Sequence, residues 1–169
     1  MPDYHVRIAN DDLVFSAAHF ITQEDNVCEP LHGHNYRVAV EIGGPLNASQ
    51  YVVDFVAVHR AVQAVLQELD HRVLLPTEHP SVHVVAGFQE VEVRFADRRW
   101  IFPRSDCRLL PLASTTAELL AQHIGRRLRE SLPLSVGARP QSIRVEVEES
   151  PGHMAVCTWR AEIEEASKS

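Results

Sequence analysis

The chain reads CEPLHGHNYRVAVEI over residues 28–42, a run that places two histidines at the start of a predicted strand. Residues two apart in a strand point to the same face, so we expect the imidazoles of His32 and His34 to lie together. A second alternating run, residues 15–19 (FSAAH), ends in His19. Two neighbouring strands of this kind would bring three imidazoles to one point.

Three histidines with one open position are typical of catalytic zinc, whereas structural zinc is usually enclosed by four protein ligands. The alternative is that these histidines are ordinary polar residues of the core or surface. The chain holds ten histidines, and four of them lie in helical or loop contexts without a partner pattern: His59, His79, His83 and His123. The spacing favours a metal site, and by itself it leaves the alternative open.

Composition and charge narrow the class of protein. A chain of 169 residues with 45% hydrophobic and 23% charged residues is expected to form one soluble domain over residues 1–169. A net charge of −7 without a basic stripe speaks against nucleic acid as a partner. No apolar run reaches membrane-spanning length, no signal peptide is recognisable, and three cysteines do not suggest a disulfide framework. We therefore expect a cytoplasmic protein with no membrane partner.

The spacing of apolar residues predicts an α+β layout with an antiparallel sheet. Along the chain the order is strand pair, helix, hairpin, helix and strand pair. The expected strands cover residues 4–9, 13–20, 32–42, 90–95, 99–102, 143–149 and 153–163. The third of these strands is expected to be broken by Gly43, Gly44, Pro45 and Asn47.

Two helices are expected where apolar residues recur at helical spacing. Asp54 is the expected N-cap of the first helix, which should end near Asp70 and His71. Its buried stripe comprises Phe55, Val58, Val62, Val65, Leu66 and Leu69. Thr115 is the expected N-cap of the second helix, with Glu118 completing a capping box. The buried face of that helix comprises Leu119, Leu120, Ile124 and Leu128.

Several further residues could carry out chemistry. Cys28 lies in a predicted loop, where it is either a proton carrier with a lowered pKa or a small buried apolar residue. His71 follows Asp70 and is either a proton shuttle oriented by that carboxylate or a ring stabilised by the helix dipole. Glu149 continues an apolar strand face. It either pairs with an arginine or binds the cationic edge of a ligand through two hydrogen bonds.

Six ordered motifs resemble the family of 6-pyruvoyltetrahydropterin and 6-carboxytetrahydropterin synthases. They are Phe15-Ser16-Ala17-Ala18-His19, Cys28-x-x-x-His32-Gly33-His34-Asn35-Tyr36, Val53-Asp54-Phe55, Leu69-Asp70-His71, Thr116-Ala117-Glu118 and Val147-Glu148-Glu149-Ser150. The motifs occur in the order found in the family and span most of the chain. The combination is therefore specific.

The resemblance implies a tunnelling fold, an antiparallel four-stranded sheet with two helices on one face. It implies a homo-oligomer, with trimers that stack into a hexamer and active sites between subunits. It also implies Zn²⁺ bound by His19, His32 and His34. The implied substrate is a small-molecule pterin triphosphate, 7,8-dihydroneopterin triphosphate.

The resemblance implies a role for each remaining candidate residue. Cys28 matches the catalytic thiol, and Asp70 with His71 matches a second proton-transfer pair. Glu149 matches the acid that binds the pterin ring, and Thr116 lies where the family places residues beside the pterin. In this scheme zinc acidifies neighbouring C–H and O–H groups, while the thiolate and the imidazole handle protons on opposite sides.

The gap between Cys28 and His32 bears on the product. Three intervening residues resemble the 6-carboxytetrahydropterin synthases of the queuosine (7-deazaguanine) pathway, which implies release of acetaldehyde and triphosphate. One alternative is a 6-pyruvoyltetrahydropterin synthase of tetrahydrobiopterin biosynthesis, or a relative acting on another pterin in a folate-like or methanopterin-like pathway. A non-catalytic pterin-binding protein is an alternative of another class, although a binder has no need of the thiol.

Two features depart from the family pattern. The segment at about residues 75–110 is longer than the usual connection, and its hairpin near residues 81–104 is expected to cover the mouth of the site or to change assembly. Leu119 stands where the family commonly has asparagine. Neither departure touches a proposed metal ligand.

Overall fold

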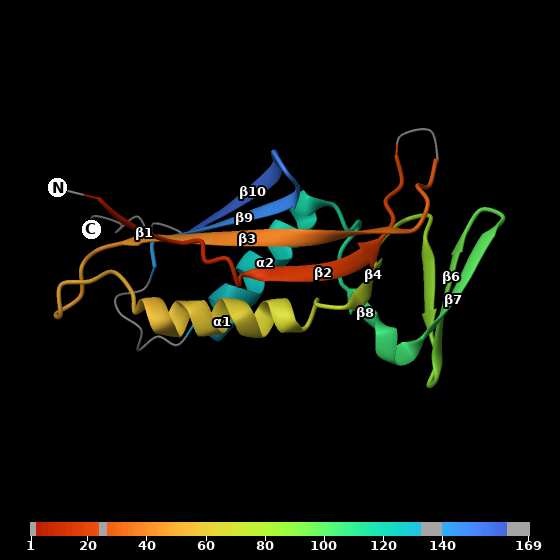
Figure 1. Cartoon of the computed structure of the whole chain (residues 1–169), viewed down its shortest axis with the longest axis horizontal. Coiled ribbons are helices and arrows are strands. Elements are labelled where there is room, and N and C mark those ends of the chain that lie inside the picture. The colour runs from red at the N-terminus through yellow and green to blue at the C-terminus, as the bar shows by residue number, and fades with distance from the viewer. Residues whose placement is uncertain (1–2, 24–26, 133–139, 162–169) are drawn as a thin grey trace, which may run out of the picture.

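The computed structural model describes residues 3–23, 27–132 and 140–161. Within them, two helices cover a seven-stranded sheet, and three further strands form a second sheet. Figure 1 shows both helices on one side of the large sheet and the small sheet at one end of the molecule. The expected α+β fold with two helices on one face is confirmed, whereas the main sheet has more strands than the four implied by the resemblance.

The large sheet has the strand order β10–β9–β3–β2–β4–β8, and β1 pairs with β3. The strands are β1 (Tyr4–Ile8), β2 (Val14–His19), β3 (His32–Gly44), β4 (Arg72–Pro76), β8 (Cys107–Leu110), β9 (Ser142–Ser150) and β10 (His153–Arg160). The last strand was expected to reach residue 163, and the part of it from residue 162 lies outside the described residues.

The expectation of a purely antiparallel sheet is wrong. β4 pairs in parallel with both β2 and β8. Parallel neighbours need a crossover connection, and here α1 links β2 and β3 to β4, while the small sheet links β4 to β8. Both strands are short and lack the alternation that marks a half-buried antiparallel strand, which is why the sequence pattern did not reveal them.

β3 runs two residues beyond its expected end at Ile42: it includes Gly43 and ends at Gly44, before Pro45. β1 pairs with this part of β3 on one side, and β9 pairs with Gly43 on the other. A Cβ at position 43 would meet Ser142 Oγ at 2.5 Å and the His5 ring at 2.8 Å. Glycine here permits close side-chain approach from both neighbouring strands, so it does not act as a strand breaker.

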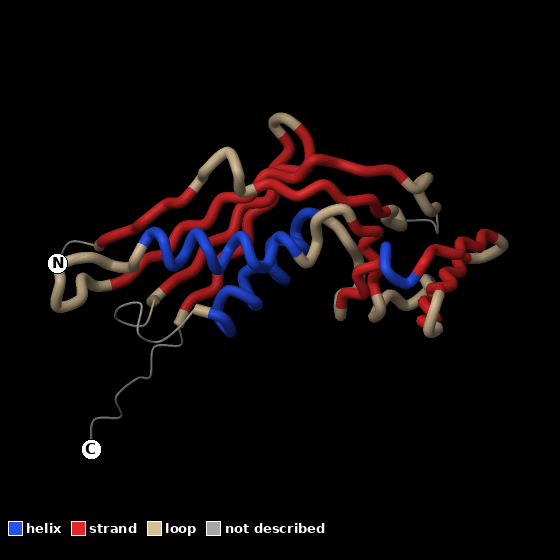
Figure 2. The backbone as a smooth tube through the Cα atoms, turned by 60° about the horizontal axis from the view of Figure 1, so that its bottom comes forward, coloured by secondary structure: helices blue, strands red, loops and turns tan. Residues whose placement is uncertain are grey.

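The helices α1 (Phe55–Gln67) and α2 (Ala117–Ser131) pack on one face of the large sheet, as Figure 2 shows from a second direction. Asp54 is the N-cap of α1 as expected, and its carboxylate accepts from the amides of Val56 and Ala57. All of the predicted stripe is buried except Phe55, which is 61% exposed because the stripe begins one turn later. Neither described helix has the length and apolar character needed to cross a bilayer.

The start of α2 differs from the prediction by one residue. Thr116, not Thr115, is the N-cap, and its hydroxyl accepts from the amide of Leu119. Thr115 is fully buried beside His19 and therefore does not cap the helix. The expected capping box between Thr115 and Glu118 is wrong, because the Thr115 side chain is buried against His19 and Thr116 caps the helix instead.

The small sheet contains the predicted hairpin and one strand that was not predicted. Its antiparallel strands are β5 (His83–Ala86), β6 (Glu90–Phe95) and β7 (Arg98–Pro103), and the short 3-10 helix η2 (Arg104–Asp106) leads from it to β8. The small sheet has its own apolar cluster, which it shares with the end of the large sheet: Phe20, Leu75, Val82, Val91, Val93, Phe95 and Cys107. The cluster attaches the small sheet to the strand end that carries His19.

Candidate active site

Three histidines converge at the end of the large sheet. His19 ends β2, and His32 and His34 begin β3. In the antiparallel register His19 lies opposite His32, and Ala17 lies opposite His34, so the three rings share one face. One nitrogen of each ring lies within 4.8 Å of the others. The sequence-predicted cluster forms, and it could hold a metal ion.

Backbone carbonyls orient two of the three rings. Since a carbonyl can only accept, Nδ1 of His19 donates to the Thr115 oxygen at 3.0 Å, and Nδ1 of His32 donates to the Pro30 oxygen at 2.8 Å. In both rings Nε2 is left as the unprotonated nitrogen that a metal requires. The Pro30 carbonyl belongs to the loop between β2 and β3 that carries Cys28, here named the thiol loop, and the Thr115 carbonyl belongs to the residue before the cap of α2.

His34 gives the strongest structural argument that the cluster holds a metal. Its Nε2 is buried and has no hydrogen-bond partner among the described residues. Buried polar atoms without a partner are rare and cost free energy, so such an atom requires an explanation. A metal at the centre of the cluster would satisfy it, and three neutral imidazoles suit zinc.

The burial of His19 favours its metal-binding form. The side chain is 1% exposed, and burial lowers the pKa of the ring, although the Thr115 carbonyl and Glu149 oppose this shift. The neighbouring rings of His32 and His34 lower the pKa further. A ring kept neutral at physiological pH is ready to bind a metal without first losing a proton.

Glu149 lies beside the histidines. Its Oε1 atom is 3.4 Å from Nε2 of His19 and 3.8 Å from Nε2 of His34. The hydroxyl of Tyr36 donates to the same oxygen at 3.4 Å, and burial together with this carboxylate raises the pKa of Tyr36. No arginine pairs with Glu149 in the described part of the chain. The alternative of a structural arginine pair is therefore not what the structure shows.

Cys28 does not join the histidine cluster through any hydrogen bond or ion pair of the described residues. It forms an isolated bridge with Thr22, and its Sγ contacts the Glu29 carbonyl at 3.5 Å. The side chain packs against the apolar cluster of the small sheet. Burial raises the pKa of the thiol, and Arg98 opposes that shift. The protein groups alone therefore do not supply the lowered pKa considered from the sequence.

Asp70 and His71 form a close pair in the turn just before β4. Oδ2 of Asp70 lies 2.8 Å from Nδ1 of His71, and Oδ1 accepts from the Ser16 amide at 2.8 Å. Burial opposes the charged form of Asp70, but the Ser16 amide and the His71 ring together lower its pKa. His71 has a positive φ of 54° and lies three residues beyond Glu68, the C-cap of α1.

The ring of His71 is 82% exposed. It opens onto a groove of about 500 Å³ that is bordered by Ser16 and Gly33 through Asn35. No hydrogen bond or ion pair connects it to His19 or His32 in the residues that the structure describes. One chain therefore forms the three-histidine cluster and the Asp–His pair but does not bring them into contact.

Thr116 lies next to the site, but its hydroxyl serves the helix. It accepts from Leu119 N at 3.5 Å as the N-cap of α2. Thr115 lies deeper, with its hydroxyl 3.3 Å from Nδ1 of His19. The proximity to the site that the resemblance implied for Thr116 is greater for Thr115.

A family model described as 6-pyruvoyl tetrahydropterin synthase matches residues 10–160. The chain belongs to the 6-pyruvoyl tetrahydropterin synthase family. The match covers both sequence motifs that supply the three histidines, and the expectation that the chain is an enzyme of the tetrahydropterin synthase type is confirmed.

The chain is similar in sequence or structure to several proteins with known names. The chain is 31% identical over 150 residues to a putative 6-carboxy-5,6,7,8-tetrahydropterin synthase of Pyrococcus horikoshii, covering 88% of this chain and 87% of that one. Its structure is similar to the 6-pyruvoyl tetrahydropterin synthase of Plasmodium vivax, with a TM-score of 0.87, 25% identity, and coverage of 95% and 100%. A shorter match, 40% over 58 residues, links it to a dihydroneopterin monophosphate aldolase of Pyrococcus furiosus, covering 34% of this chain and 48% of that one.

Glu29 is a candidate residue that the sequence analysis missed. Its Oε2 atom lies 3.9 Å from Nε2 of His32, and its Oε1 atom accepts from the Gln23 side chain at 2.9 Å. A form of the Plasmodium vivax family member with alanine in place of a glutamate is described as a catalytic residue mutant. The available signal was an acidic residue between the thiol and the His-Gly-His turn.

Proposed function

We propose that this chain is a zinc-dependent lyase that converts 7,8-dihydroneopterin triphosphate and one water molecule to 6-carboxy-5,6,7,8-tetrahydropterin, acetaldehyde and triphosphate, in the cytoplasmic 7-deazaguanine (queuosine) pathway. The observation that carries the proposal is the meeting of one nitrogen from each of three imidazoles, among them the buried Nε2 of His34, which has no hydrogen-bond partner among the described residues. The three-residue gap between Cys28 and His32 and the name of the Pyrococcus horikoshii relative support the 6-carboxy product.

In this proposal His19, His32 and His34 hold zinc, which supplies Lewis acidity to the oxygens of the substrate side chain. Glu149 accepts two hydrogen bonds from the amino group and the ring N–H of the pterin. Because its carboxylate lies 3.4 Å and 3.8 Å from two of the histidines, a pterin held there places its side chain next to the metal ligands. Thr116 lies at the border of the same region.

Two groups of this chain can move protons in the proposed reaction. Cys28 would take a proton from the substrate side chain as the thiolate, and His71, oriented by Asp70, would serve the opposite side. The exposure of His71 and its lack of contact with the cluster in one chain support a site completed by a second copy. We therefore propose a homo-oligomer, a trimer or hexamer, in which His71 of one subunit faces the zinc site of another.

Product analysis tests the reaction. The zinc-loaded protein is incubated with 7,8-dihydroneopterin triphosphate, and the products are separated and identified by mass spectrometry. Acetaldehyde together with 6-carboxytetrahydropterin supports the proposal. Triphosphate release that leaves the carbon skeleton intact would instead identify a 6-pyruvoyltetrahydropterin synthase, and binding without turnover would identify a pterin-binding protein.

Mixing two inactive variants tests the shared site. Cys28→Ala and His71→Ala are each expected to be inactive as pure proteins. Co-expressed in one cell they should form mixed oligomers, in which roughly a quarter of the sites combine two intact halves. Recovery of activity near this level supports the shared site. No recovery, with mixed oligomers shown by native mass spectrometry, would place Cys28 and His71 in the same subunit's site.

Glu29 favours a second candidate function. Its carboxylate lies near His32 on the same loop as the thiol, where it could act as a general base in an aldol-type cleavage of a dihydroneopterin phosphate. The match to the dihydroneopterin monophosphate aldolase supports this candidate. Glu29→Gln and Cys28→Ala separate the two functions: loss of aldol cleavage only in Glu29→Gln would assign that reaction to the carboxylate.

A further inference from the structure

Arg98, the first residue of β7, holds the loop that carries the thiol. Its Nη1 donates to the Cys28 carbonyl at 2.6 Å and to the Glu29 carbonyl at 3.2 Å. Both acceptors belong to the backbone of the two residues to which proton transfer is assigned above. A planar guanidinium with several donors in a fixed geometry suits such a double contact.

Arg98 is itself held in place by an aromatic stack. Its guanidinium lies over the ring of Trp100, 4.6 Å from the centroid, and Trp100 stacks on Phe20 with centroids 4.7 Å apart and planes 13° apart. Phe20 directly follows the proposed ligand His19. The stack therefore links the strand end that bears a metal ligand to the arginine that bonds the thiol loop.

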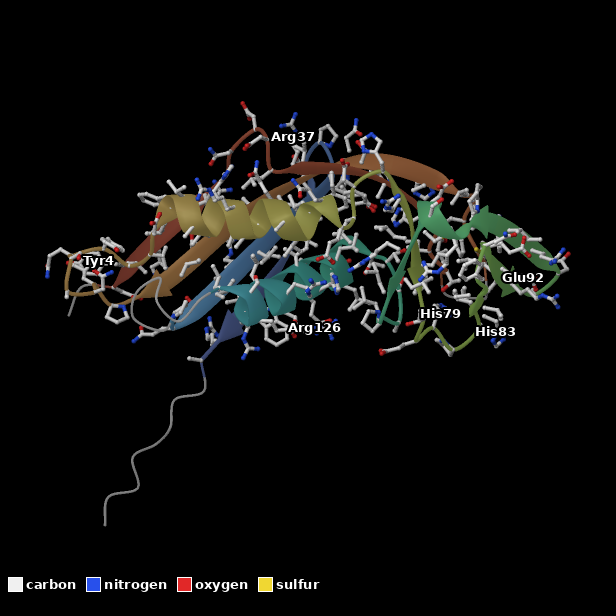
Figure 3. The ribbon with its side chains drawn as sticks, turned by 90° about the horizontal axis from the view of Figure 1, so that it is seen from below. Tyr4, Arg37, His79, His83, Glu92 and Arg126 are labelled. Carbon is white, nitrogen blue, oxygen red and sulfur yellow. The ribbon has the colours of Figure 1, made fainter. Side chains whose placement is uncertain are left out.

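His79, in the segment that leads into the small sheet, contacts the other side of the thiol loop, at Thr22 near the end of β2. Nδ1 of His79 accepts from the amides of Ser81 and Val82, each at 2.9 Å, so Nε2 bears the hydrogen and donates to Thr22 Oγ1 at 2.7 Å. Thr22 is the residue that bridges to Cys28. Figure 3 shows His79 at the same end of the molecule as the small sheet, with Tyr4 at the opposite end.

We propose that the small sheet β5–β7 with the segment leading into it is a positioning element for Cys28 and Glu29, and that Arg98 is its main positioning residue. Three contacts reach both sides of the thiol loop from this one element, and none of them uses a metal ligand. The catalytic consequence rests on the proposed function, whereas the positioning itself does not. Displacement of a reactive group by about 1 Å can cost about 100-fold in rate.

The test compares Arg98→Met with Arg99→Met. The first keeps the aliphatic stem and removes both loop contacts. The second removes a neighbouring guanidinium of the same strand that pairs with Glu92 and forms no hydrogen bond to the loop residues that the structure describes. Three measurements are made on the zinc-loaded proteins: amide hydrogen exchange of peptides covering residues 20–31, the rate of Cys28 alkylation by iodoacetamide, and kcat and KM with dihydroneopterin triphosphate.

We expect Arg98→Met to raise both the exchange rate of the loop and the alkylation rate of Cys28 at least fivefold. With zinc content unchanged, kcat should fall at least tenfold while KM stays within threefold, because the residue acts on placement of the thiol and not on pterin binding. Arg99→Met should match the wild type in all measurements. Arg98→Lys, which keeps the charge and one donor, should recover part of the loop protection.

Wild-type exchange and alkylation in Arg98→Met would overturn the proposal whatever the turnover. The same is true if Arg99→Met loosens the loop as much as Arg98→Met does, since the effect would then be a general weakening of the small sheet. If the wild type turns over no dihydroneopterin phosphate, the proposed function fails. The exchange and alkylation measurements still decide whether Arg98 holds the loop.

Discussion

The carboxylate oxygen Oε1 of Glu149 lies 3.4 Å from Nε2 of His19, although the two residues come from β9 and β2, which are not neighbours in the sheet. β3 lies between these strands and contributes Tyr36, whose hydroxyl contacts both groups. The acid and the proposed metal ligand therefore belong to one continuous arrangement on the helix-covered face. Glu149 is close enough to be either a substrate-binding acid or an additional metal ligand.

The two roles of Glu149 differ in a measurable way. We predict that Glu149→Gln raises KM for the pterin substrate at least tenfold, because the amide offers the pterin one acceptor where the carboxylate offers two. Zinc content should stay near one per subunit, measured by inductively coupled plasma mass spectrometry. A loss of zinc with little change in KM would assign Glu149 to the metal.

His32→Ala should remove the metal. Loss of one of three protein ligands leaves a site with two imidazoles, and we expect the bound zinc to fall at least tenfold after dialysis against a weak chelator. His59→Ala is the matched control, since His59, on α1, pairs with Asp12 and takes no part in the cluster. Zinc retained in His32→Ala would show that the ligand is misassigned.

Cys28→Ala should abolish turnover and leave zinc binding intact. The thiol is proposed to carry a proton and is not a metal ligand, so kcat is expected to fall at least 100-fold. Cys157→Ala, on β10, controls for the removal of a partly buried thiol elsewhere. Activity within twofold of the wild type in Cys28→Ala would exclude the thiol from the reaction.

Gly125→Ala should destabilise the fold although alanine is the better helix former. A Cβ at position 125 would lie 2.5 Å from Nε1 and 2.6 Å from Cδ1 of Trp159 on β10. Overpacking of this kind costs about 1–3 kcal/mol, against a gain of about 1 kcal/mol in helix propensity. We expect a lower Tm by circular dichroism, with Gln122→Ala on the exposed side of α2 as the control. An unchanged Tm would mean that the indole moves aside.

Stability should fall in mild acid through His123. Burial, with Arg126 and Arg127 adding repulsion, lowers the pKa of His123 to about 4. The unfolded chain therefore binds a proton below about pH 6.5 that the folded chain binds only below about pH 4, so the unfolding free energy decreases as pH falls through this window. Between pH 7 and pH 5 this residue should account for about 2 kcal/mol.

Urea unfolding at pH 7 and pH 5 measures the effect. In His123→Leu the loss of stability between the two pH values should be smaller than in the wild type by about 2 kcal/mol. The same loss in both proteins would show that His123 gains its proton without cost and that other groups govern the acid response.

Local features of the sequence predicted their structures well. Alternation placed His19, His32 and His34 on one face, because side-chain direction in a strand depends only on the position along it. The cap at Asp54 and the helical stripe from Val58 were found for the same reason. The Thr115 cap was wrong because two adjacent threonines satisfy the local rule equally, and only the buried neighbour His19 distinguishes them.

Contacts between distant segments could not be predicted from the pattern of residues along the sequence. The hydrogen bonds of Arg98 to the thiol loop join residues 70 and 69 apart in sequence, and nothing in the composition of β7 marks that arginine among its neighbours. Glu29 was overlooked because its significance depends on its distance from His32 and not on its type. The parallel partners of β4 depend on crossover connections whose path is set by packing.

By itself the sequence determined the family, the three-histidine set and the two strands that carry it, since these depend on residue type and on the two-residue period of a strand. The tertiary structure alone decided that Glu149 faces the histidines, that Thr115 and not Thr116 supports His19, and that the small sheet holds the thiol loop. These relationships arise where strands and loops from distant parts of the chain pack together, and their geometry is a property of that packing.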